Sequence, residues 1–241
     1  MILYNDDCLT ILKTLESSSV DATICDPPYS ITRAKWDKQL PWDEIFTELL
    51  RVNKPKSPIV LFASQPFTSY LVTNFLSSYR YQWVWVKNIS TNFLNAKKQP
   101  LRNTEDILVF SKEGNPTYNL QKREGLEPYT RVKVTKLSNI YGKEKGHISE
   151  SVDGTRYPHT TLHFSKGQHE RKLHPSQKPL ELMKYLVNTY TKKEDIVLDF
   201  CMGSGSTLLA AKELNRNFIG IEKDERFYNV AIERLSSRKT Y

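Results

Sequence analysis

Short apolar runs alternate along this chain with segments whose apolar residues recur every three or four positions. The apolar runs predict seven strands, because strands buried on both faces of a sheet read as continuous apolar and β-branched residues. These strands lie at residues 2–4, 21–25, 58–63, 81–87, 105–110, 195–200 and 217–222. The helical spacing predicts helices at residues 9–15, 43–51, 66–77, 179–187, 205–214 and 224–236. Strands that alternate with helices predict an α/β fold, with a mostly parallel sheet covered by helices on both faces.

The periodicity weakens between residues 112 and 172, where Gly, Pro, His, Lys and Arg are frequent. Twelve Lys and Arg residues in this segment oppose seven Asp and Glu residues, a net charge of +5. We therefore expect one core built from two halves, residues 1–111 and 173–241, with residues 112–172 inserted between them. A second irregular stretch, residues 88–103, is longer than a hairpin requires, and loops of that length are usually functional or disordered.

The composition narrows the function and the compartment. The 241 residues carry a net charge of +8 and a pI of about 9.2, which favours a polyanionic partner, nucleic acid first. Three cysteines, Cys8, Cys25 and Cys201, are too sparse and odd in number for a disulfide framework. No apolar run approaches the roughly 18 residues of a spanning helix, and the first residues lack the features of a signal peptide, so we expect a cytoplasmic protein. His159 and His163 have helical spacing but no cysteine or carboxylate cluster beside them, so no metal site is predicted.

The most informative stretch is Asp26-Pro27-Pro28-Tyr29, which follows the strand at residues 21–25. Neither proline can donate a backbone hydrogen bond, and the second restricts the first to an extended conformation, so the stretch forms a stiff elbow. The elbow presents the Asp26 carboxylate, the free carbonyl of Pro27 and the ring of Tyr29 close together. A strand that ends in a plain Pro-Pro turn, with Tyr29 covering the core, is the alternative for this motif alone.

A second stretch, residues 196–207, reads as a strand, a glycine loop and the start of a helix. Gly203 and Gly205 permit a ligand to approach the backbone closely. Ser206 and Thr207 lie near the free amides of the helix N-terminus, which can meet a carboxylate. A tight structural turn is the alternative for this motif alone.

The strand after this loop ends in Glu222, an acid placed to accept both ribose hydroxyls of an adenosine cofactor. The dinucleotide fingerprint fails because Leu208 occupies its third glycine position, so a nucleoside ligand without a pyrophosphate fits better. Ligands of parallel sheets bind beyond the carboxyl ends of the strands. We therefore expect one edge of the sheet to be lined by Asp7, Asp26, Ser64, Gly203 and Glu222.

Together the two stretches resemble motifs of the β group of S-adenosylmethionine-dependent DNA amino-methyltransferases, in which the catalytic half precedes the cofactor half. That family has an Asp-Pro-Pro-Tyr elbow and an Asp-Phe-x-x-Gly-x-Gly-(Ser/Thr) loop, found here at residues 26–29 and 199–206. Further stretches similar to the family's motifs lie at residues 6–9, 85–87, 95–96, 105–108 and 174–179. The chain departs from the family at Asp6, where glycine is usual, and at Thr104, where histidine is common. The resemblance covers residues 1–110 and 173–241 and implies that the insert is a target-recognition region.

The resemblance also implies a Rossmann-like methyltransferase sheet that binds S-adenosylmethionine along its edge. Glu222 would hold the ribose, Asp7 would lie near the adenine, and Lys178 would meet the carboxylate of the cofactor. The cofactor-binding positions that it implies are Asp7, Cys8, His174, Ser176, Lys178, Asp199, Phe200, Gly203, Gly205, Ser206, Thr207, Glu222 and Lys223.

For the reaction, the resemblance implies methyl transfer to an exocyclic amino group of a base that has left the duplex stack. The catalytic positions are those of the elbow, Asp26, Pro27, Pro28 and Tyr29. The Asp26 carboxylate and the Pro27 carbonyl each accept one N–H bond, which frees the nitrogen lone pair, and Tyr29 offers a ring on which the base can stack. Cytosine enzymes of the family usually carry serine in place of Asp26, so we favour the N6 amino group of adenine. The N4 amino group of cytosine, an RNA or protein amide target, and a non-catalytic DNA-binding relative are the alternatives.

DNA is the partner that both the charge and the resemblance favour. The resemblance is also compatible with a homodimer and with a separately encoded restriction endonuclease, in a bacterial or phage-encoded system. Basic side chains of the long loop and of the insert are the candidates for contact with phosphates and bases. The candidate DNA contacts are Lys87, Asn95, Lys97, Lys98, Arg102, Arg123, Arg131, Lys133 and Arg156.

Overall fold

The computed structural model describes residues 1–32, 34, 37–133, 136–138, 142–144, 147–165, 173 and 177–237, without the side chains of residues 133–149. The chain divides into two compact units. The larger unit joins Met1–Asn119 to Thr160–Tyr241, and the smaller unit is Leu120–His159. The two parts of the larger unit are therefore distant in the sequence but share one core.

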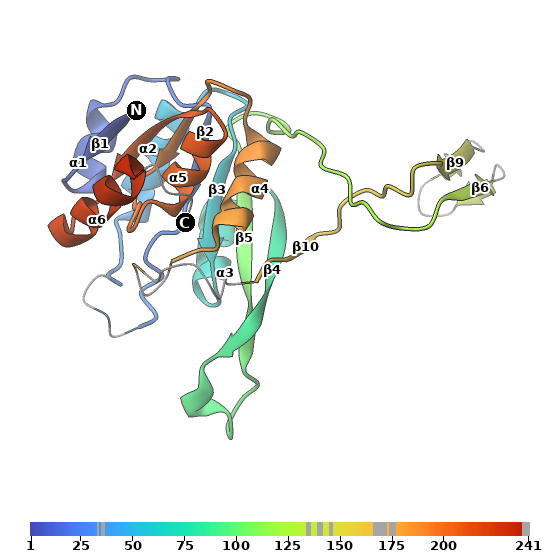
Figure 1. Cartoon of the computed structure of the whole chain (residues 1–241), viewed down its shortest axis with the longest axis horizontal. Coiled ribbons are helices and arrows are strands. Elements are labelled where there is room, and N and C mark those ends of the chain that lie inside the picture. The colour runs from blue at the N-terminus through green and yellow to red at the C-terminus, as the bar shows by residue number, and fades with distance from the viewer. Residues whose placement is uncertain are drawn as a thin grey trace. The chain divides into compact units, whose positions relative to one another are not determined.

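Among the described residues, an eight-stranded sheet forms the centre of the larger unit (Figure 1). In spatial order its strands are β1 (Ile2–Tyr4), β12 (Asn217–Ile221), β11 (Ile196–Asp199), β2 (Ala22–Cys25), β3 (Ile59–Ala63), β5 (Arg102–Phe110), β4 (Tyr79–Thr91) and β10 (Thr161–His163). Neighbouring strands are parallel, except that β5 runs antiparallel to both β3 and β4. The predicted α/β class with a mostly parallel sheet is thus confirmed.

The predicted count of seven strands is wrong by one. The additional strand is β10, which pairs in parallel with β4 and places Leu162 opposite Trp85. It lies within residues 112–172, which we expected to stand outside the core. A strand of three residues, two of them exposed, carries no periodic signal, and this explains why the pattern of the sequence did not reveal it.

Strands β4 and β5 also run further than predicted and form a long hairpin. We expected a loop at residues 88–103, but β4 continues to Thr91 and β5 begins at Arg102. A short 3-10 helix, η1 (Phe93–Asn95), lies at the turn. The outer residues of the two strands are exposed in succession, so they lack the alternation by which a half-buried strand is recognised.

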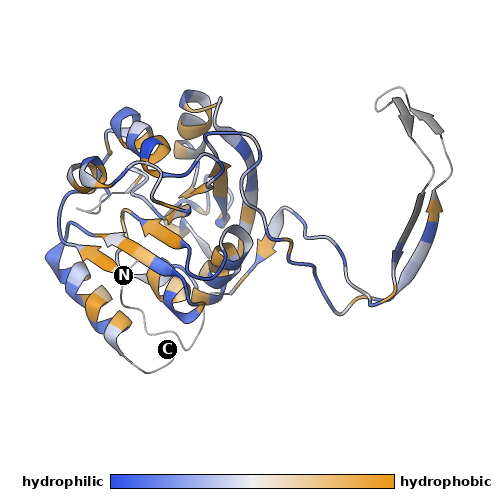
Figure 2. Cartoon of the chain, turned by 90° about the horizontal axis from the view of Figure 1, so that it is seen from above, coloured by the Kyte–Doolittle hydropathy of each residue, from blue (hydrophilic) through white to orange (hydrophobic). Residues whose placement is uncertain are grey.

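Helices cover both faces of the sheet, and two apolar clusters mark the two layers. One cluster includes side chains of α4 (Leu180–Tyr190), α5 (Ser206–Glu213) and α6 (Glu225–Ser236); the other includes side chains of α1 (Cys8–Thr14), α2 (Trp42–Val52) and α3 (Phe67–Asn74). Successive strand residues alternate between the layers, since Ile24 packs in the first cluster and Cys25 in the second. Both faces of the central strands are therefore buried, which is why these strands read as apolar runs (orange in Figure 2).

The smaller unit contains two antiparallel strand pairs. β6 (Tyr129–Lys133) pairs with β9 (His147–Ser151), and β7 (Lys136–Ser138) pairs with β8 (Gly142–Glu144). Near the two ends of this unit, Arg123 and Arg156 form an isolated antiparallel bridge through backbone hydrogen bonds of 2.8 and 2.9 Å. In the part of the chain that the structure describes, no helix combines the length and the apolar character needed to cross a bilayer.

Candidate active site

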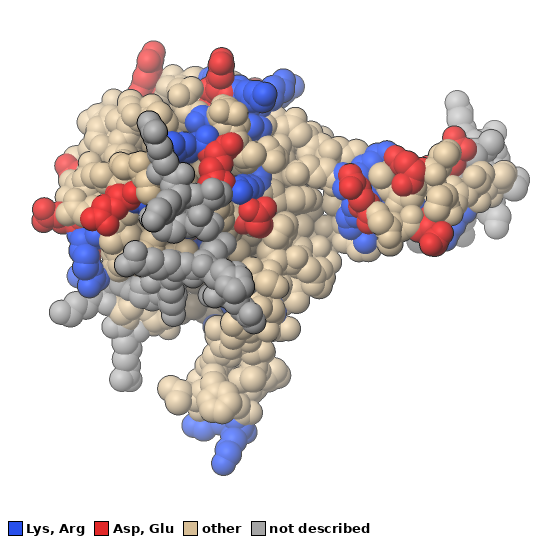
Figure 3. All heavy atoms as spheres, viewed as in Figure 1, with Lys and Arg blue, Asp and Glu red and all other residues tan. Residues whose placement is uncertain are grey.

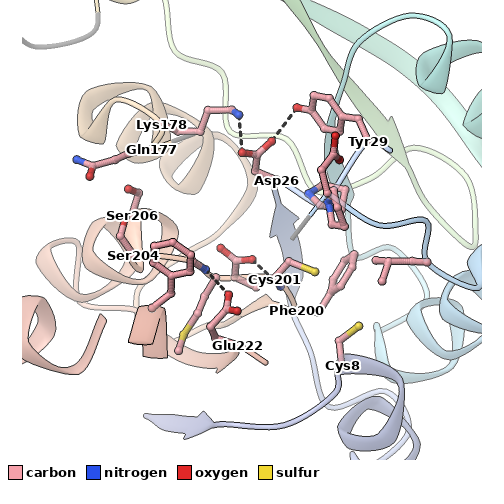
Figure 4. A pocket seen from close by; sticks show the side chains of 18 of the residues that line it. Cys8, Asp26, Tyr29, Gln177, Lys178, Phe200, Cys201, Ser204, Ser206 and Glu222 are labelled. Carbon is pink, nitrogen blue, oxygen red and sulfur yellow. Dashed lines mark hydrogen bonds and ion pairs between the residues drawn. The ribbon is translucent and has the colours of Figure 1, made fainter. Parts of the chain in front are cut away.

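A cavity of about 800 Å³ opens at the carboxyl edge of the sheet in the larger unit. Its volume lies within the range of about 300–1,000 Å³ that is usual for small-molecule and cofactor sites. Figure 4 shows side chains from distant parts of the chain that point into this space. The residues that we expected at one edge, Asp7, Asp26, Ser64, Gly203 and Glu222, all line it. The parallel strands thus bring the elbow and the glycine loop into one site.

The elbow lies directly beyond β2, whose four residues are all buried. Asp26 Oδ1 accepts a hydrogen bond of 2.7 Å from the hydroxyl of Tyr29, three residues further along. The Tyr29 ring stacks on Phe67, with ring centroids 5.5 Å apart and planes 24° from parallel. Pro27 is buried, and Pro28 lines the cavity. The Tyr29 ring is therefore fixed from two sides, and the Asp26 carboxylate faces the cavity.

A row of paired charged side chains continues from Asp26 along the cavity wall. Lys178 Nζ lies 2.5 Å from Asp26 Oδ2 and 3.2 Å from Glu105 Oε2. Lys87 Nζ lies 3.0 Å from Glu105 Oε1. We expected Lys178 to meet the cofactor carboxylate, but its ammonium is paired with these two acids, and its side chain is only 7% exposed. Lys87, a candidate DNA contact, is likewise buried in the wall, with 5% of its side chain exposed.

Burial and the neighbouring charges shift the pKa of each of these side chains, and the two effects partly oppose each other. Burial raises the pKa of Asp26, while the Lys178 ammonium lowers it and the Glu105 carboxylate raises it. Burial also raises the pKa of Glu105, but Lys178 and Lys87 outweigh this and hold it below its ordinary value. Burial lowers the pKa of Lys178, and the two carboxylates raise it above its ordinary value. The cation is thus charged between two acids, and Asp26 is the acid that is harder to ionise.

The glycine loop between β11 and α5 forms the opposite wall. Gly203 and Gly205 adopt left-handed backbone conformations, with φ of +50° and +74°. The Gly203 amide donates to Glu222 Oε2 at 2.9 Å, and the Asp224 amide donates to Glu222 Oε1 at 2.8 Å. Each oxygen of Glu222 therefore receives one backbone hydrogen bond and keeps capacity for a second donor.

A cation that the sequence did not flag supports this loop from behind. Arg234 of α6 is 2% exposed and donates to the Ser204 carbonyl at 3.2 Å and to Ser206 Oγ at 2.9 Å. Its only sequence signal is a basic residue in the last turn of a helix, which is a common position for such residues. Arg234 therefore ties α6 to the loop that carries Ser206.

Other predicted cofactor positions lie around the glycine loop. Asp7 caps α1 by accepting from the Leu9 amide at 3.0 Å, and Lys223 Nζ lies 3.1 Å from the other Asp7 oxygen. Asp199, at the end of β11, is 3% exposed; burial raises its pKa to about 6, against hydrogen bonds with Thr207 and Cys25 that lower it. The predicted positions that line the cavity here are Cys8, Lys223, Asp199, Phe200, Ser206 and Thr207.

The loop after the elbow depends on an acid that we did not predict. The Asp37 carboxylate accepts from the backbone amides of Ser30, Ile31 and Thr32 at 2.6, 3.0 and 2.6 Å. Asp37 is 7% exposed and lines the cavity. A single Asp in a polar stretch is not distinguishable from a solvated one, so no pattern could have identified it.

The remaining candidates fall into three groups. His174 and Ser176 lie outside the described residues, as does the side chain of Lys133. The side chains on the hairpin, Asn95, Lys97, Lys98 and Arg102, are exposed. In the smaller unit Arg131 is exposed. Arg123 donates to the Tyr157 carbonyl at 3.1 Å. Arg156 donates to the Glu127 carbonyl and lies over the Tyr129 ring. Arg123 and Arg156 thus hold that unit together.

Comparison with known proteins places this geometry among DNA methyltransferases. The model of the N6 and N4 DNA methylase family matches residues 20–233. Type II methyltransferase M.HindIII of Haemophilus influenzae is 29% identical over 98% of this chain and 96% of its own length. DNA adenine methyltransferase YhdJ of Escherichia coli is 27% identical over 99% of this chain and 84% of its own length. The crystal structure of the M1.HpyAVI–SAM complex superposes with a TM-score of 0.71 at 28% identity, covering 98% of this chain and 99% of that one.

Proposed function

This chain belongs to the DNA methylase family of S-adenosylmethionine-dependent N6 and N4 methyltransferases, and we propose that its target is the N6 amino group of a flipped-out adenine. The observation that carries this proposal is the carboxylate of Asp26, which faces the cavity beside the backbone of Pro27. The similarity to YhdJ, which is named a DNA adenine methyltransferase, supports adenine over cytosine.

The residues of the elbow would act on the amino group through hydrogen bonds. An exocyclic amino nitrogen is a poor nucleophile because its lone pair is delocalised into the ring. One N–H bond to Asp26 and one to the Pro27 carbonyl pull the nitrogen towards tetrahedral geometry and free that lone pair. The carboxylate also stabilises the positive charge that develops on the nitrogen. Tyr29 would position the base, since its ring is already fixed by Asp26 and Phe67.

The opposite wall fits the cofactor of the family. Glu222 has an acceptor site left on each oxygen, which suits two ribose hydroxyls. The left-handed Gly203 lines the cavity together with Ser206 and Thr207, whereas Gly205 faces Ala231 of α6. S-adenosylmethionine supplies a methyl group on a good leaving group, so the protein's task is to align the amino nitrogen with that methyl.

Mass spectrometry of nucleosides tests the assignment. DNA incubated with the protein and S-adenosylmethionine should contain N6-methyladenine, and N4-methylcytosine in its place would overturn the proposal. Asp26→Asn keeps the size of the side chain but removes its charge, and we expect it to lower the methylation rate at least about a hundredfold. The dissociation constant of S-adenosylmethionine, measured by calorimetry, should stay within a fewfold of wild type and serves as the control for folding.

We also propose that the insert reads the DNA sequence. Its compact part is Leu120–His159, since residues 112–119 and 160–165 belong to the larger unit with the two core halves. This unit has paired strands of its own and an exposed Arg131, and both features support a separate recognition surface. A homodimer and a separately encoded restriction endonuclease remain proposals, and the naming of M.HindIII as a type II methyltransferase supports the second.

A further inference from the structure

The hairpin of β4 and β5 projects from the edge of the sheet that holds the cavity. Both β3 and β4 are antiparallel to β5, so β4 runs parallel to β3 and its last residues pass the carboxyl edge (Figure 1). Val84 of β4 lies level with Ala63, the last residue of β3, because Asp106 of β5 pairs with both of these residues. It then continues to Thr91. These further residues, at about 3.3 Å each, carry the hairpin on the order of 20 Å beyond the edge.

The inner part of the hairpin is a wall of the active site. Lys87 and Thr91 of β4, and Arg102 and Glu105 of β5, line the cavity. The hairpin thus borders the same cavity that Asp26 lines. The outer part of the hairpin extends beyond this wall, on the side of the sheet where the cavity opens.

The tip of the hairpin is apolar and exposed. Phe93 is 79% exposed and Leu94 97% exposed, both in the short helix η1 at the turn. Ile89 and Leu101, on the flanking segments, are 56% and 39% exposed. Single exposed apolar residues are common, but a cluster of four on one projecting element is typical of an interaction site.

The segment that follows the tip is basic. Lys97, Lys98 and Arg102 are exposed, and the sequence has no Asp or Glu from Lys87 to Asn103. Figure 3 shows Lys and Arg side chains at the outer end of the hairpin and no Asp or Glu side chain there in this view. Apolar side chains next to cations on one projecting element match the DNA duplex, where apolar base faces lie beside rows of phosphates.

We propose that this tip enters the DNA duplex as a wedge. Phe93 and Leu94 pack against the base faces exposed when the target base leaves the stack, and Lys97 and Lys98 contact the adjacent phosphates. Apolar side chains inserted between base steps offset part of the energy of unstacking, which otherwise opposes base flipping. The inference rests on the proposed function, because it requires that a base be flipped out of duplex DNA.

The wedge is tested by substrates that differ only in how firmly the target base is held. The double variant Phe93→Ser with Leu94→Ser is compared with wild type on a paired duplex that contains the methylated site found by modified-base sequencing. The same duplex with an abasic site opposite the target base requires little energy for flipping. We expect kcat/KM of the variant to fall about ten- to a hundredfold on the paired duplex and to stay within about twofold of wild type on the abasic one.

Two controls separate the wedge from a general loss of function. Leu76→Ser alters a residue that is 65% exposed but lies outside the hairpin, and it should leave kcat/KM unchanged on both duplexes. Phe93→Leu together with native Leu94 keeps an apolar tip and should retain most of the activity on the paired duplex.

Three outcomes would overturn the wedge. The first is wild-type kcat/KM of the double variant on the paired duplex, and the second is an equal loss on both duplexes. The third is sedimentation that shows a dimeric wild type and a monomeric variant, because the tip would then bind a second copy of the chain. A wild-type protein that methylates neither duplex would refute the proposed function itself, and the wedge with it.

Discussion

The charge of the Asp26 carboxylate depends on one lysine. Its two oxygens contact the Tyr29 hydroxyl and the Lys178 ammonium, and Lys178 in turn contacts Glu105. Only the ionised carboxylate can accept a hydrogen bond from a base amino group while it stabilises positive charge. Since burial raises the pKa of Asp26 and Lys178 lowers it, the lysine extends the pH range in which the acid works.

Lys178→Met should therefore move the acid limb of the pH–rate profile to higher pH. Loss of the cation leaves burial and the Glu105 carboxylate, which both raise the pKa of Asp26. An opposite charge at this distance typically lowers a carboxyl pKa by about 1–3 units, so we expect a shift of that size. Single-turnover methylation rates between pH 5 and about 9 would measure it.

Two further variants isolate the effect of the charge. Lys178→Arg keeps the cation and should keep the acid limb in place. Lys87→Met removes a cation that pairs directly with Glu105, so its effect on the limb should be smaller. If Lys178→Met weakens S-adenosylmethionine binding but leaves the acid limb unmoved, the lysine serves the cofactor carboxylate instead, as the family resemblance implies.

Asp199 makes the stability of the protein depend on pH. Burial raises its pKa to about 6 in the folded state, whereas an unfolded Asp has a pKa of about 3.9. Between these values the folded state binds more protons than the unfolded state, so this residue lowers the free energy of unfolding as pH rises from about 4 to 6. Asp199→Asn does not titrate. Urea unfolding at several pH values should show the variant gaining up to about 3 kcal/mol relative to wild type between pH 4 and 7. A difference that does not change with pH would contradict this account.

At the scale of elements, the turn from β11 into α5 shows how a loop is shaped by the helix packed behind it. Gly205 precedes α5 with φ of +74°, and a Cβ added there would lie 3.3 Å from the Cβ of Ala231 on α6. A side chain at this position would thus meet both backbone strain and a neighbouring helix. Because Ser206 follows directly, a shift of the loop would also move the wall of the cofactor site.

Gly205→Ala should lower both stability and cofactor affinity. The left-handed conformation costs about 1–2 kcal/mol for a residue with a Cβ. The contact of the new Cβ with Ala231 should in addition displace the loop. We expect S-adenosylmethionine to bind at least about tenfold more weakly, since each 1.4 kcal/mol is a factor of ten. Gly114→Ala is a matched control in the same unit, because its φ is +54° and nothing lies within 4 Å of the added Cβ. The control should lose similar stability in thermal unfolding but keep wild-type affinity; equal affinity losses would show that the loop does not transmit the change.

The elements that could be predicted from the sequence are those with strong periodicity. β2 and β3 are buried on both faces, and α4 has an apolar stripe, so each gives an unambiguous pattern. The elbow and the glycine loop were found because proline restricts the backbone and glycine permits conformations that other residues rarely adopt. β10 and the outer hairpin were not predicted, because short or fully exposed strands have no periodicity.

Contacts between distant residues were the other part that the sequence could not supply. The pairing of Lys178 with Glu105 and Asp26, and the support of Ser206 by Arg234, depend on which elements lie together in three dimensions. Spacing along the chain identifies a charged residue but not its partner. A buried charge requires a partner, so the burial of Lys178 could be interpreted only with the fold in hand.

At the scale of the whole molecule, the larger unit holds the two residues between which the smaller unit is inserted, Asn119 and Thr160. The Asn119 amide donates to the Thr189 carbonyl at 2.7 Å, and its side chain donates to the carbonyls of Asn188 and Thr191. At the other junction the Thr160 carbonyl accepts from the Val84 amide at 2.8 Å. The core unit thus determines where the chain leaves and where it returns, independently of the residues between.

Replacement of Leu120–His159 by a short Gly-Ser linker should therefore separate recognition from catalysis. The anchors at Asn119 and Thr160 stay in place, and a change in loop length alters the closure entropy by only about 0.6 kcal/mol per doubling. The variant should bind S-adenosylmethionine with wild-type affinity and unfold at a similar temperature, because Asp26, Glu222 and the glycine loop all belong to the larger unit. Sequencing that detects modified bases should then show methylation that is weaker and no longer confined to one DNA sequence.

The point substitution Arg131→Ala keeps the unit intact and should weaken binding to the site. If this arginine contacts a phosphate, the slope of log affinity against log salt concentration should fall by about 1. Retention of the wild-type sequence preference without Leu120–His159 would place recognition in the core, where the hairpin is the next element to examine.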